Sequence, residues 1–492
     1  MVSLLKKIHN PSLIQYLFLG FIGAISVFAF SPFDIKFVIV ISLVILIQFI
    51  ITSRNFHEAL KVAFAWGFGY WVSGTGWLIV SIYYYGNTGI ILSIFLVILM
   101  GILLSFVFIG PLSILKLIES NQNIFFKSVI FASMLLILEL SRFLFLGGFP
   151  WLLPGLVFVD TLGANVIPIF GVYGASFITY FLSSFIALCI VRKKKNHFIL
   201  GILSLLILLP FQTNQKESSN ESLSIAIIQP SLDPFKKFQH EGYLNIEDAL
   251  IELTNENLNE DLIIWPESPL PYLNFSLKME NLLTRLDGAP PIISGAWEYE
   301  NNKLHNTMTV LGSNQSYSKR HLVPFGEYVP FEGILRGLIN FFDLPMSSVS
   351  KGKPNQGLFE INNFKVLGII CFDAAFPLSY LDEIREANFI VNISNDTWFG
   401  SSYGPHQHLQ IVRARALESN KWIARGTSDG ISTIVDNKGT IVNSLSKGLK
   451  GSLKGQVYKT AEPSLFYRYG YIITPLICFI FLAHLVILRF RK

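Results

Sequence analysis

Three residues of types that can carry out acyl transfer stand in separate, distinctive stretches of the sequence: Glu267, Lys319 and Cys371. An unperturbed thiol has a pKa of about 8.5 and is mostly protonated at neutral pH, so a nearby base would make Cys371 a better nucleophile. Glu267 follows the apolar run Ile263–Pro266, where partial desolvation would raise its pKa and suit it to proton transfer. Lys319 would stabilise the thiolate and the oxyanion of a tetrahedral intermediate. The three residues together predict a thiol acyl-transfer or amide-cleaving site.

Each of these residues taken alone also has a purely structural interpretation. A single cysteine at the end of a strand is usually a small buried hydrophobic residue. A glutamate after a strand is usually solvated, and a lysine beside an arginine, as Lys319 is beside Arg320, is usually on the surface. The order Glu, Lys, Cys, with each residue in a distinctive context, is more specific than any one of them and favours the catalytic interpretation.

The elements that must position these residues form a pattern of short β-runs alternating with helices. It begins after the polar stretch Thr213–Glu221, which we interpret as a linker. Continuous apolar runs such as Leu262–Trp265 are typical of a sheet covered on both faces, and ligand sites of α/β folds form at strand ends. Strands are predicted at 223–228, 261–265, 291–294, 306–311, 366–370, 389–394, 431–436 and 440–443, and helices at 245–259, 276–286, 377–387 and 405–420. An α/β domain is therefore predicted over residues 213–466.

The rest of the chain is predicted to lie largely within a membrane. Of its 492 residues, 51% are hydrophobic and 14% are charged, whereas soluble domains carry about 25% charged residues. Apolar spans lie near 12–31, 35–52, 59–84, 88–115, 125–145, 164–191, 198–212 and 467–488, each near or above the length that crosses about 30 Å of hydrocarbon. We predict a transmembrane domain of about seven helices over residues 1–212, and a C-terminal transmembrane helix with a tail over 467–492.

Basic residues gather in alternate connections between these spans. Lys6 and Lys7 precede the first span, Arg192–Lys195 precedes the seventh, and Arg489 and Arg491 follow the last. The bias of Lys and Arg toward the cytoplasmic side predicts that both termini are cytoplasmic and that the α/β domain lies on the opposite face. These basic residues beside the spans explain the net charge of +5, so nothing indicates a nucleic-acid partner.

Two further pairs of residues have types that can form part of a site. His406 and His408 form a His-x-His pair, but the sequence brings no Cys, His or Asp cluster beside them, so no metal or other cofactor is predicted. Trp398 and Phe399 lie in a loop after a predicted strand. Core packing and the lining of an acyl-chain entrance both remain open for them.

The Glu-Lys-Cys order resembles the triad of the nitrilase (carbon–nitrogen hydrolase) superfamily, whose members share an αββα sandwich. Within it, nearly the whole chain resembles the apolipoprotein N-acyltransferases, integral membrane enzymes that finish bacterial lipoproteins. The resemblance implies a membrane α-helical bundle of about eight transmembrane helices and an α/β nitrilase-like αββα sandwich domain. The matching stretches are Tyr317–Pro330, Asn395–Gly400, Gly404–His408, Arg413–Glu418 and, in the membrane arm, Glu139–Arg142 with Gly148–Trp151.

The resemblance also implies a role for each site residue. By it, Glu267 is the general base, Lys319 the oxyanion stabiliser, Cys371 the nucleophile and Glu327 an additional active-site glutamate. The chain departs from the family at Phe372-Asp373, where the family usually has Tyr-Glu. That departure concerns only the roles of these two side chains and leaves the triad complete.

The reaction implied by the resemblance has two steps, needs no cofactor and takes place at the bacterial inner (cytoplasmic) membrane, with the catalytic domain on the periplasmic side. A phospholipid, with phosphatidylethanolamine as the expected donor, acylates Cys371, and the α-amine of a diacylglyceryl-cysteine apolipoprotein then takes the acyl chain. Two alternatives remain: a membrane-tethered amidohydrolase with water as acceptor, and a transporter or scaffold with a degenerate domain. The many spans disfavour the first, and the complete triad disfavours the second.

Overall fold

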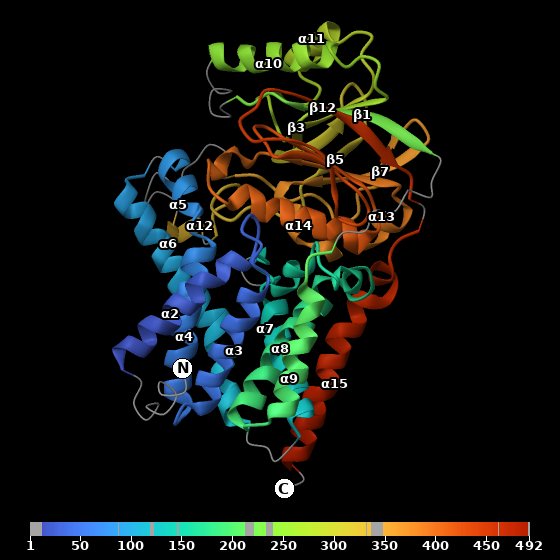
Figure 1. Ribbon diagram of the computed structural model, residues 1–492. Helices are drawn as coiled ribbons and strands as arrows, with labels where there is room; N and C mark the ends of the chain where they lie inside the picture. Colours follow the sequence, from blue (N-terminus) through green and yellow to red (C-terminus); the bar gives the residue numbers. More distant parts are fainter. Residues whose placement is uncertain are drawn as a thin grey trace. The chain divides into compact units, whose positions relative to one another are not determined.

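The computed structural model in Figure 1 describes residues 12–86, 88–118, 123–144, 147–211, 221–232, 240–330, 332–335, 348–460 and 462–490. The chain divides into two compact units. The helical unit comprises Met1–Ile79, Gly89–Gln212 and Tyr469–Lys492. The α/β unit comprises Thr213–Arg468 together with the short segment Val80–Thr88 from the N-terminal part of the chain.

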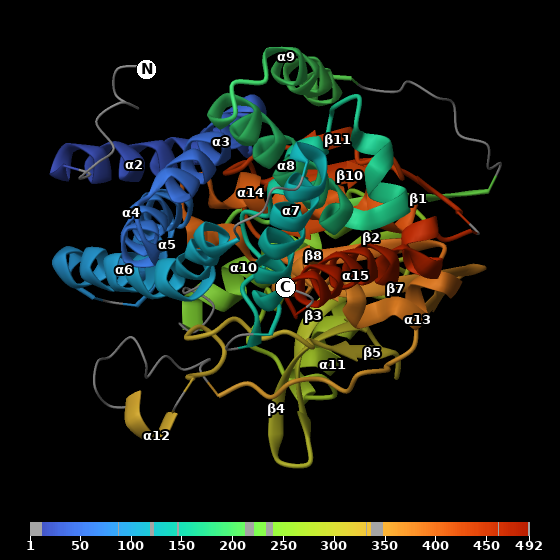
Figure 2. The same ribbon diagram turned by 90° about the horizontal axis from the view of Figure 1, so that it is seen from below.

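The helical unit consists of apolar helices joined by short connections. Its main helices are α2 (Leu13–Ile25), α3 (Phe37–Thr52), α4 (Phe56–Gly74), α6 (Ile90–Leu104), α7 (Ile124–Ser141), α8 (Ile167–Val191), α9 (Lys195–Ser204) and α15 (Tyr471–Phe490). Short 3-10 or π segments extend or connect several of them, at Ser26–Ala29, Ser105–Ile109, Gly110–Leu117, Pro154–Phe158, Ala164–Val166, Leu205–Leu208 and Phe466–Gly470. Helix α4 lies between α2 and α6, and α8 packs on α7 and α3 (Figure 2).

Glycines allow α2 and α4 to cross at close range. A Cβ atom on Gly23 would lie 2.0 Å from the carbonyl oxygen of Trp66, and one on Gly69 would lie 1.8 Å from that of Gly20. Small residues at a crossing bring helix backbones together, which is a common way for membrane helices to associate. Polar side chains also join helices here: the Trp66 indole N–H donates to Ser42 Oγ of α3 across 2.8 Å.

Among the described residues, four helical segments are long and apolar enough to cross a membrane: Ile90–Leu117, Ile124–Ser141, Ala164–Val191 and Phe466–Ile487. Leu13–Ala29, Phe37–Thr52 and Lys195–Leu208 are apolar but shorter. One predicted span is wrong in its extent. The run 59–84 is not a single helix, because α4 ends at Gly74 and the chain continues through α5 (Leu78–Val80) into a π turn at Ser81–Tyr85. Glycine is a poor helix former, and Gly74 and Gly76 flank the break.

The α/β unit contains two six-stranded sheets. The first has the strand order β12-β1-β2-β3-β4-β5 and the second has the order β11-β10-β9-β8-β7-β6. In the first sheet, β1, β2 and β3 are parallel, and in the second, β7, β8 and β9 are parallel. The strands of the first sheet are β1 (Ser222–Gln229), β2 (Leu262–Ile264), β3 (Ile292–Glu300), β4 (Lys303–Val310), β5 (Ser316–Ser318) and β12 (Gly451–Tyr458). Those of the second are β6 (Phe359–Ile361), β7 (Phe364–Ile370), β8 (Phe389–Ser394), β9 (Ile423–Thr427), β10 (Ser432–Val435) and β11 (Ile441–Leu445).

The two sheets pack face to face with helices outside them, so the predicted αββα sandwich is confirmed. Helices α10 (His240–Asn255) and α11 (Leu277–Arg285) cover the first sheet, and α13 (Leu381–Glu386) and α14 (Gly404–Ser419) cover the second (Figure 1). Alternate residues of β1 supply two cores: Ile225 and Ile227 face the second sheet, while Ala226 and Ile228 face the helices. This alternation is the period of two expected of a strand. A short helix, α12 (Glu332–Leu335), lies in a connection.

Each of the eight predicted strand runs overlaps an observed strand, but β5, β6, β9 and β12 were missed. Strands β5 and β6 are three residues long, too short for a period to show. Strand β9 contains Arg425, which is fully buried, and charged residues are depleted in strand patterns. The third predicted helix, 377–387, is a 3-10 turn at Pro377–Tyr380 followed by α13.

Candidate active site

Strand ends bring the three predicted catalytic residues together. Glu267 follows β2, Lys319 is the first residue after β5, and Cys371 is the first residue after β7. Asn395 comes directly after β8, which is parallel to β7. The carboxyl ends of parallel strands meet at one edge of a sheet, and the face-to-face packing of the two sheets brings the edge that carries Glu267 to the edge that carries Cys371.

Glu267 is buried, with 7% of its surface exposed, and its carboxylate accepts three hydrogen bonds. Oε1 lies 3.0 Å from Lys319 Nζ and 2.8 Å from Asn306 Nδ2. Oε2 accepts the backbone N–H of Asn395 across 2.9 Å. The backbone reaches this position because β3 has a glycine opposite it: a Cβ on Gly295 would lie 2.1 Å from Ser268 N.

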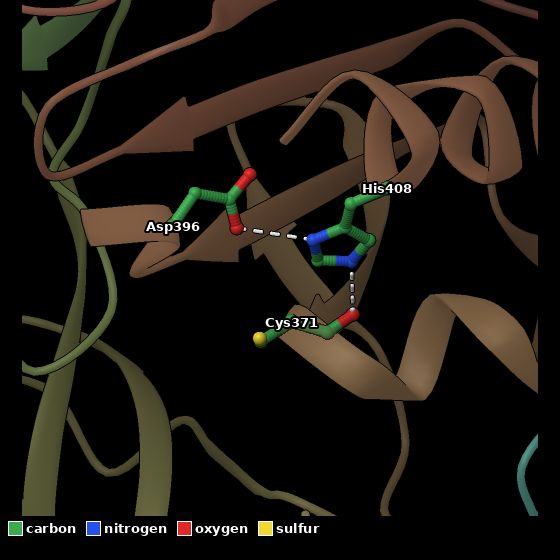
Figure 3. Close-up of side chains that lie close together, drawn as sticks. All are labelled: Cys371, Asp396 and His408. Carbon is green, nitrogen blue, oxygen red and sulfur yellow. Dashed lines mark hydrogen bonds and ion pairs between the residues drawn. The ribbon is translucent and has the colours of Figure 1, made fainter. Parts of the chain in front are cut away.

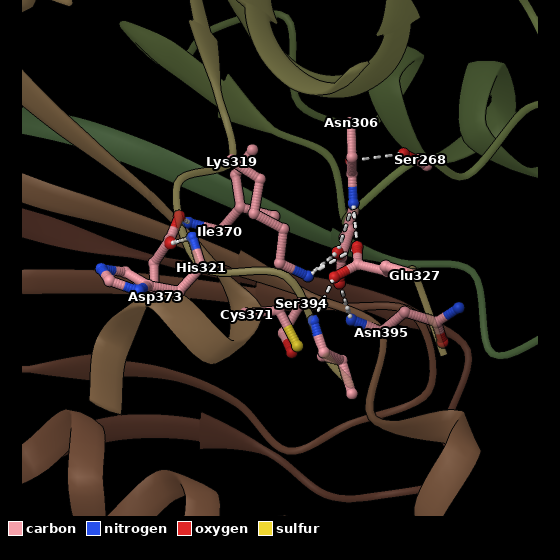
Figure 4. A network of polar contacts seen from close by, with 12 residues as sticks. Ser268, Asn306, Lys319, His321, Glu327, Ile370, Cys371, Asp373, Ser394 and Asn395 are labelled. Carbon is pink, nitrogen blue, oxygen red and sulfur yellow. Dashed lines mark hydrogen bonds and ion pairs between the residues drawn. The ribbon is translucent and has the colours of Figure 1, made fainter. Parts of the chain in front are cut away.

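Glu327 supplies a second carboxylate to the same ammonium group. Its Oε1 lies 2.9 Å from Lys319 Nζ and 3.0 Å from Asn306 Nδ2. Its Oε2 accepts the backbone N–H of Val323 across 2.8 Å. Figure 4 shows the end of the Lys319 side chain directed toward Glu327, with Asn306 above both. The site therefore holds two carboxylates that share one lysine and one asparagine.

Cys371 occupies a backbone conformation that L-residues seldom adopt. Its φ is 47°, and the left-handed region costs a non-glycine residue about 1–3 kcal/mol. The residue directly follows β7 and begins a 3-10 helix over Cys371–Ala375. Such outliers cluster at functional sites, where surrounding structure holds them. The sharp turn leaves the half-buried thiol at the strand end.

The charges of the site disfavour a thiolate at rest. Burial raises the pKa of the Cys371 thiol far above its usual range, the Glu267 carboxylate raises it further, and Lys319 only partly opposes them. Burial alone would lower the pKa of Lys319, but Glu267 and Glu327 raise it well above its ordinary value. The site thus rests with Lys319 charged and Cys371 protonated, so the thiol needs a base when it reacts.

Asp373, one of the two departures from the family pattern, connects the cysteine turn to the lysine loop. Its Oδ1 accepts the backbone N–H of His321 across 2.7 Å, and its Oδ2 accepts the Tyr317 hydroxyl across 3.0 Å. Burial raises the pKa of Asp373 to about 6. Because Tyr317 and His321 flank Lys319 in the sequence, Asp373 fixes the loop that carries the ammonium group.

A second buried network lies on the other side of Cys371. The His408 ring lies between Asp396 and the carbonyl oxygen of Cys371 (Figure 3), with Nδ1 3.0 Å from Asp396 Oδ1 and Nε2 3.1 Å from that carbonyl. Arg425 donates to Asp396 Oδ2 across 2.5 Å. Although burial opposes it, the charges of Arg425 and His408 hold the pKa of Asp396 well below its usual range, so this carboxylate is ionised.

By distance alone, Cys371, Asp396 and His408 resemble a metal site, since one ligand atom from each lies within 4.8 Å of the others. Their chemistry fits a metal poorly. The Arg425 guanidinium already supplies a cation to Asp396, and His408 Nε2 faces a backbone carbonyl. These residues form a closed hydrogen-bonded network instead.

Trp398 and Phe399 lie on a 3-10 turn, Asp396–Phe399, that also carries Asp396. Both are half-buried, and the Phe399 ring packs edge-on against His408 at 6.3 Å between centroids. The Trp398 carbonyl accepts the Ser81 hydroxyl across 2.7 Å. These contacts tie the turn to the active site and to the segment Val80–Thr88.

The structure brings Glu267, Lys319, Glu327 and Cys371 into one site. It also adds residues to which sequence reasoning gave no role: Asn306, Asn395, Asp396 and Arg425, with His408 in a role other than metal ligand. Asn306 lies within β4 and has no distinctive sequence context. His408 and Asp396 did carry a signal, because both lie in the stretches that matched the family.

Comparisons with known proteins agree across the chain. A family model described as the apolipoprotein N-acyltransferase N-terminal domain matches residues 22–185, and one described as carbon-nitrogen hydrolase matches residues 224–460. An apolipoprotein N-acyltransferase of Pseudomonas syringae is 31% identical over 91% of this chain and 92% of its own length. One of Vibrio vulnificus is 30% identical over 92% of each, and one of Pasteurella multocida is 31% identical over 96% of this chain and 94% of its own.

Two similar solved structures each cover about half of the chain. Saccharomyces cerevisiae Nit3, a member of the nitrilase superfamily, matches with a TM-score of 0.37 and 18% identity, covering 50% of this chain and 93% of its own. A CN-hydrolase superfamily protein of Xanthomonas campestris matches with a TM-score of 0.36 and 17% identity, covering 52% and 97%.

Proposed function

Because this chain belongs to the apolipoprotein N-acyltransferase family, we propose that it transfers an acyl chain from a phospholipid, through a thioester on Cys371, to the N-terminal α-amine of a diacylglyceryl-cysteine apolipoprotein. The observation that carries this proposal is the meeting of Glu267, Lys319 and Cys371 at the ends of three strands. The family assignment supports acyl transfer over the amidohydrolase alternative, since the match includes the N-terminal domain of the acyltransferases. The family assignment also disfavours the interpretation of the chain as a transporter or scaffold.

In the first step, Glu267 takes the thiol proton and Cys371 Sγ attacks the ester carbonyl of the phospholipid. Among the described residues, Glu267 Oε2 accepts only the N–H of Asn395, and a carboxylate oxygen has two lone pairs, so one remains for the proton. The C–O bond breaks, the leaving alkoxide takes the proton from Glu267, and a lysophospholipid departs. A thioester on Cys371 remains.

Lys319 stabilises the negative oxygen of the tetrahedral intermediate. An ammonium group has three N–H donors, and two of them are committed to Glu267 and Glu327. No described residue accepts from the third, which can donate to the oxyanion, and fixed donors stabilise an oxyanion without reorganisation. Glu327 keeps the ammonium in position, and the peptide N–H that follows Cys371 is a second candidate donor.

In the second step, the α-amine of the apolipoprotein attacks the thioester carbonyl. Glu267 takes a proton from the amine, the C–S bond breaks, and Cys371 leaves as a thiolate that recovers the proton. The products are an amide-linked third acyl chain and the free enzyme.

We also propose the arrangement of the chain in the membrane. A transmembrane domain of about seven helices over residues 1–212 and a final helix over 467–492 hold the catalytic domain, residues 213–466, on the periplasmic side of the bacterial inner membrane. Both termini are cytoplasmic. The charged connections support this orientation, and phosphatidylethanolamine is the proposed donor. Trp398 and Phe399 are proposed to line the acyl entrance, supported by their half-buried positions and by the contact of the Phe399 ring with His408.

The test is the intact mass of the purified protein after incubation with phosphatidylethanolamine and no acceptor. We expect a gain of one acyl chain that hydroxylamine removes, that is absent in Cys371→Ala and that persists in the matched control Cys189→Ala. A diacylated cysteinyl peptide should then discharge the thioester and gain an amide-linked chain. An adduct that survives in Cys371→Ala would rule out the thioester mechanism.

A further inference from the structure

His408 contacts the backbone of Cys371, and the protonation of its ring follows from its partners. Nε2 lies 3.1 Å from the Cys371 carbonyl oxygen, and a carbonyl oxygen can only accept a hydrogen bond. Nε2 must therefore carry a proton. On the other side of the ring, Nδ1 lies 3.0 Å from Asp396 Oδ1 and 3.2 Å from a guanidinium nitrogen of Arg425. His408 is 1% exposed, so no bulk water competes for these partners.

The partners of His408 are themselves held by the second sheet. Asp396 accepts from Ser394 Oγ across 2.7 Å and from Arg425 across 2.5 Å. Arg425 also donates to Asn392 Oδ1, and Asn392 Nδ2 donates to the carbonyl of Ile369, in β7, across 3.0 Å. Strands β7, β8 and β9 thus form a chain of contacts that fixes the imidazole ring relative to the strand that delivers the cysteine.

The position of the Cys371 carbonyl determines the geometry around the thiol. A peptide unit is planar, so a carbonyl fixed by His408 also fixes the plane and direction of the Phe372 N–H, which points the opposite way. Cys371 is in a strained left-handed conformation, with φ of 47°, and such a conformation persists only where the surroundings hold it. The hydrogen bond from His408 is a contact that holds it.

We propose that His408, oriented by Asp396 and Arg425, is a positioning residue that fixes the peptide plane of Cys371 and so aims the thiol and the following N–H at the reacting carbonyl. His408 is not an alternative general base, although one of its nitrogens lies within 4.8 Å of Cys371 Sγ. Nε2 carries a proton that is committed to the carbonyl, and Nδ1 is committed to Asp396 and Arg425. Glu267 keeps the role of base.

This inference rests on the proposed nucleophilic role of Cys371, so the wild-type thioester is measured first. If wild-type protein forms none, the proposed function fails, and His408 is not in question. Given the thioester, the rate of acylation by phospholipid is compared in His408→Ala, His408→Leu and His408→Gln. Glutamine keeps an N–H donor near the position of Nε2, while leucine fills the volume without one. His406→Gln, two residues away on the same helix, is the matched control.

We expect His408→Ala and His408→Leu to lower the acylation rate constant on the order of 100-fold, as for a misplacement of a reacting group by about 1 Å. KM for phospholipid should stay unchanged, and iodoacetamide should still alkylate Cys371. His408→Gln should recover most of the rate, and His406→Gln should match wild type. Wild-type rates in His408→Ala or His408→Leu would overturn the proposal. So would equal losses in the glutamine and leucine variants, or a failure of both donor-free variants to fold, which would mean that His408 serves folding alone.

Discussion

Lys319 and Glu327 form a buried ion pair with 2.9 Å between Nζ and Oε1, in addition to the pair that Lys319 makes with Glu267. Two buried carboxylates therefore face one buried ammonium group. A thiolate would add a further negative charge with no new cation, which explains why the resting thiol stays protonated. In this arrangement Glu327 balances and holds Lys319, while Glu267 is left to exchange a proton.

The first prediction is that Glu267→Gln makes Cys371 more reactive toward a small alkylating reagent while it strongly slows acyl transfer. The Glu267 carboxylate raises the pKa of the thiol, so its removal lowers that pKa and increases the thiolate fraction about tenfold per unit at a given pH. Acyl transfer, which needs the base, should fall by about 10²–10⁴-fold. Iodoacetamide labelling of Cys371 between pH 7 and 10 and the acylation assay measure the two effects.

Lys319→Met should change the reactivity of the Cys371 thiol in the opposite direction. Lysine lowers the pKa of the thiol, so its loss should slow alkylation as well as acyl transfer. Alkylation that slows in Glu267→Gln, or that speeds up in Lys319→Met, would contradict the charge balance described for the site.

The second prediction concerns Asn306, which donates from one amide nitrogen to both Glu267 and Glu327 and accepts the Ser268 hydroxyl across 3.0 Å. Asn306→Ala removes buried hydrogen bonds to charged groups, each contributing about 1.5–3 kcal/mol. We expect thioester formation to slow by about 10- to 100-fold, with a matched loss in kcat, because 1.4 kcal/mol corresponds to about tenfold. Asn306→Asp should be worse than Asn306→Ala, since it places a third carboxylate beside the other two.

The third prediction tests the close approach of β3 to Glu267. A Cβ on Gly295 would lie 2.1 Å from Ser268 N and 2.8 Å from the Glu267 carbonyl carbon, so Gly295→Ala must displace the segment that carries the base. The rate of acylation by phospholipid should fall, while the rate at which iodoacetamide alkylates Cys371 should change little. The matched control is Gly333→Ala, where a Cβ would meet no atom within 4 Å. Equal activity of the two variants would show that the base does not depend on this contact.

The fourth prediction is acid sensitivity that depends on His321, whose ring stacks on Phe376 with 3.8 Å between centroids. Burial, aided by the positive charges of Lys351 and Arg320, lowers the pKa of His321 to about 4. The unfolded chain then binds a proton near pH 6.5 that the folded protein does not bind until about pH 4. Stability should therefore fall as pH drops from 6.5 toward 4, by about 2 kcal/mol at pH 5 from this group.

His321→Phe keeps the stacking and removes the titrating group. Its melting temperature should drop less than that of wild type between pH 7 and pH 5, in the same detergent. A parallel decline of both proteins would assign the acid sensitivity to other groups. Asp373 contributes with the opposite sign, because its raised pKa of about 6 makes stability fall as pH rises from about 4 to 6, and it is present in both proteins.

The sequence by itself determined the two kinds of structure and suggested which groups react. The apolar run Val366–Ile370 predicted a buried strand that ends directly before Cys371. This prediction was possible because the signals for strands and turns are local in the sequence. The family resemblance then assigned roles to Glu267, Lys319 and Glu327. Local patterns also predicted apolar spans, but not their breaks, as the interruption after Gly74 shows.

Only the tertiary structure decided which polar residues surround those groups. Asn306, in β4, contacts both Glu267 and Glu327, which lie in loops far from it in the sequence. His408 lies on a helix, 37 residues after Cys371 in the sequence, and contacts the carbonyl of that cysteine. No period or motif encodes such contacts, because they depend on how two sheets and a helix pack. Arg425 shows the same limit: it is fully buried, because Asn392 of the neighbouring strand and Asp396 of the turn that follows it supply partners for its charge.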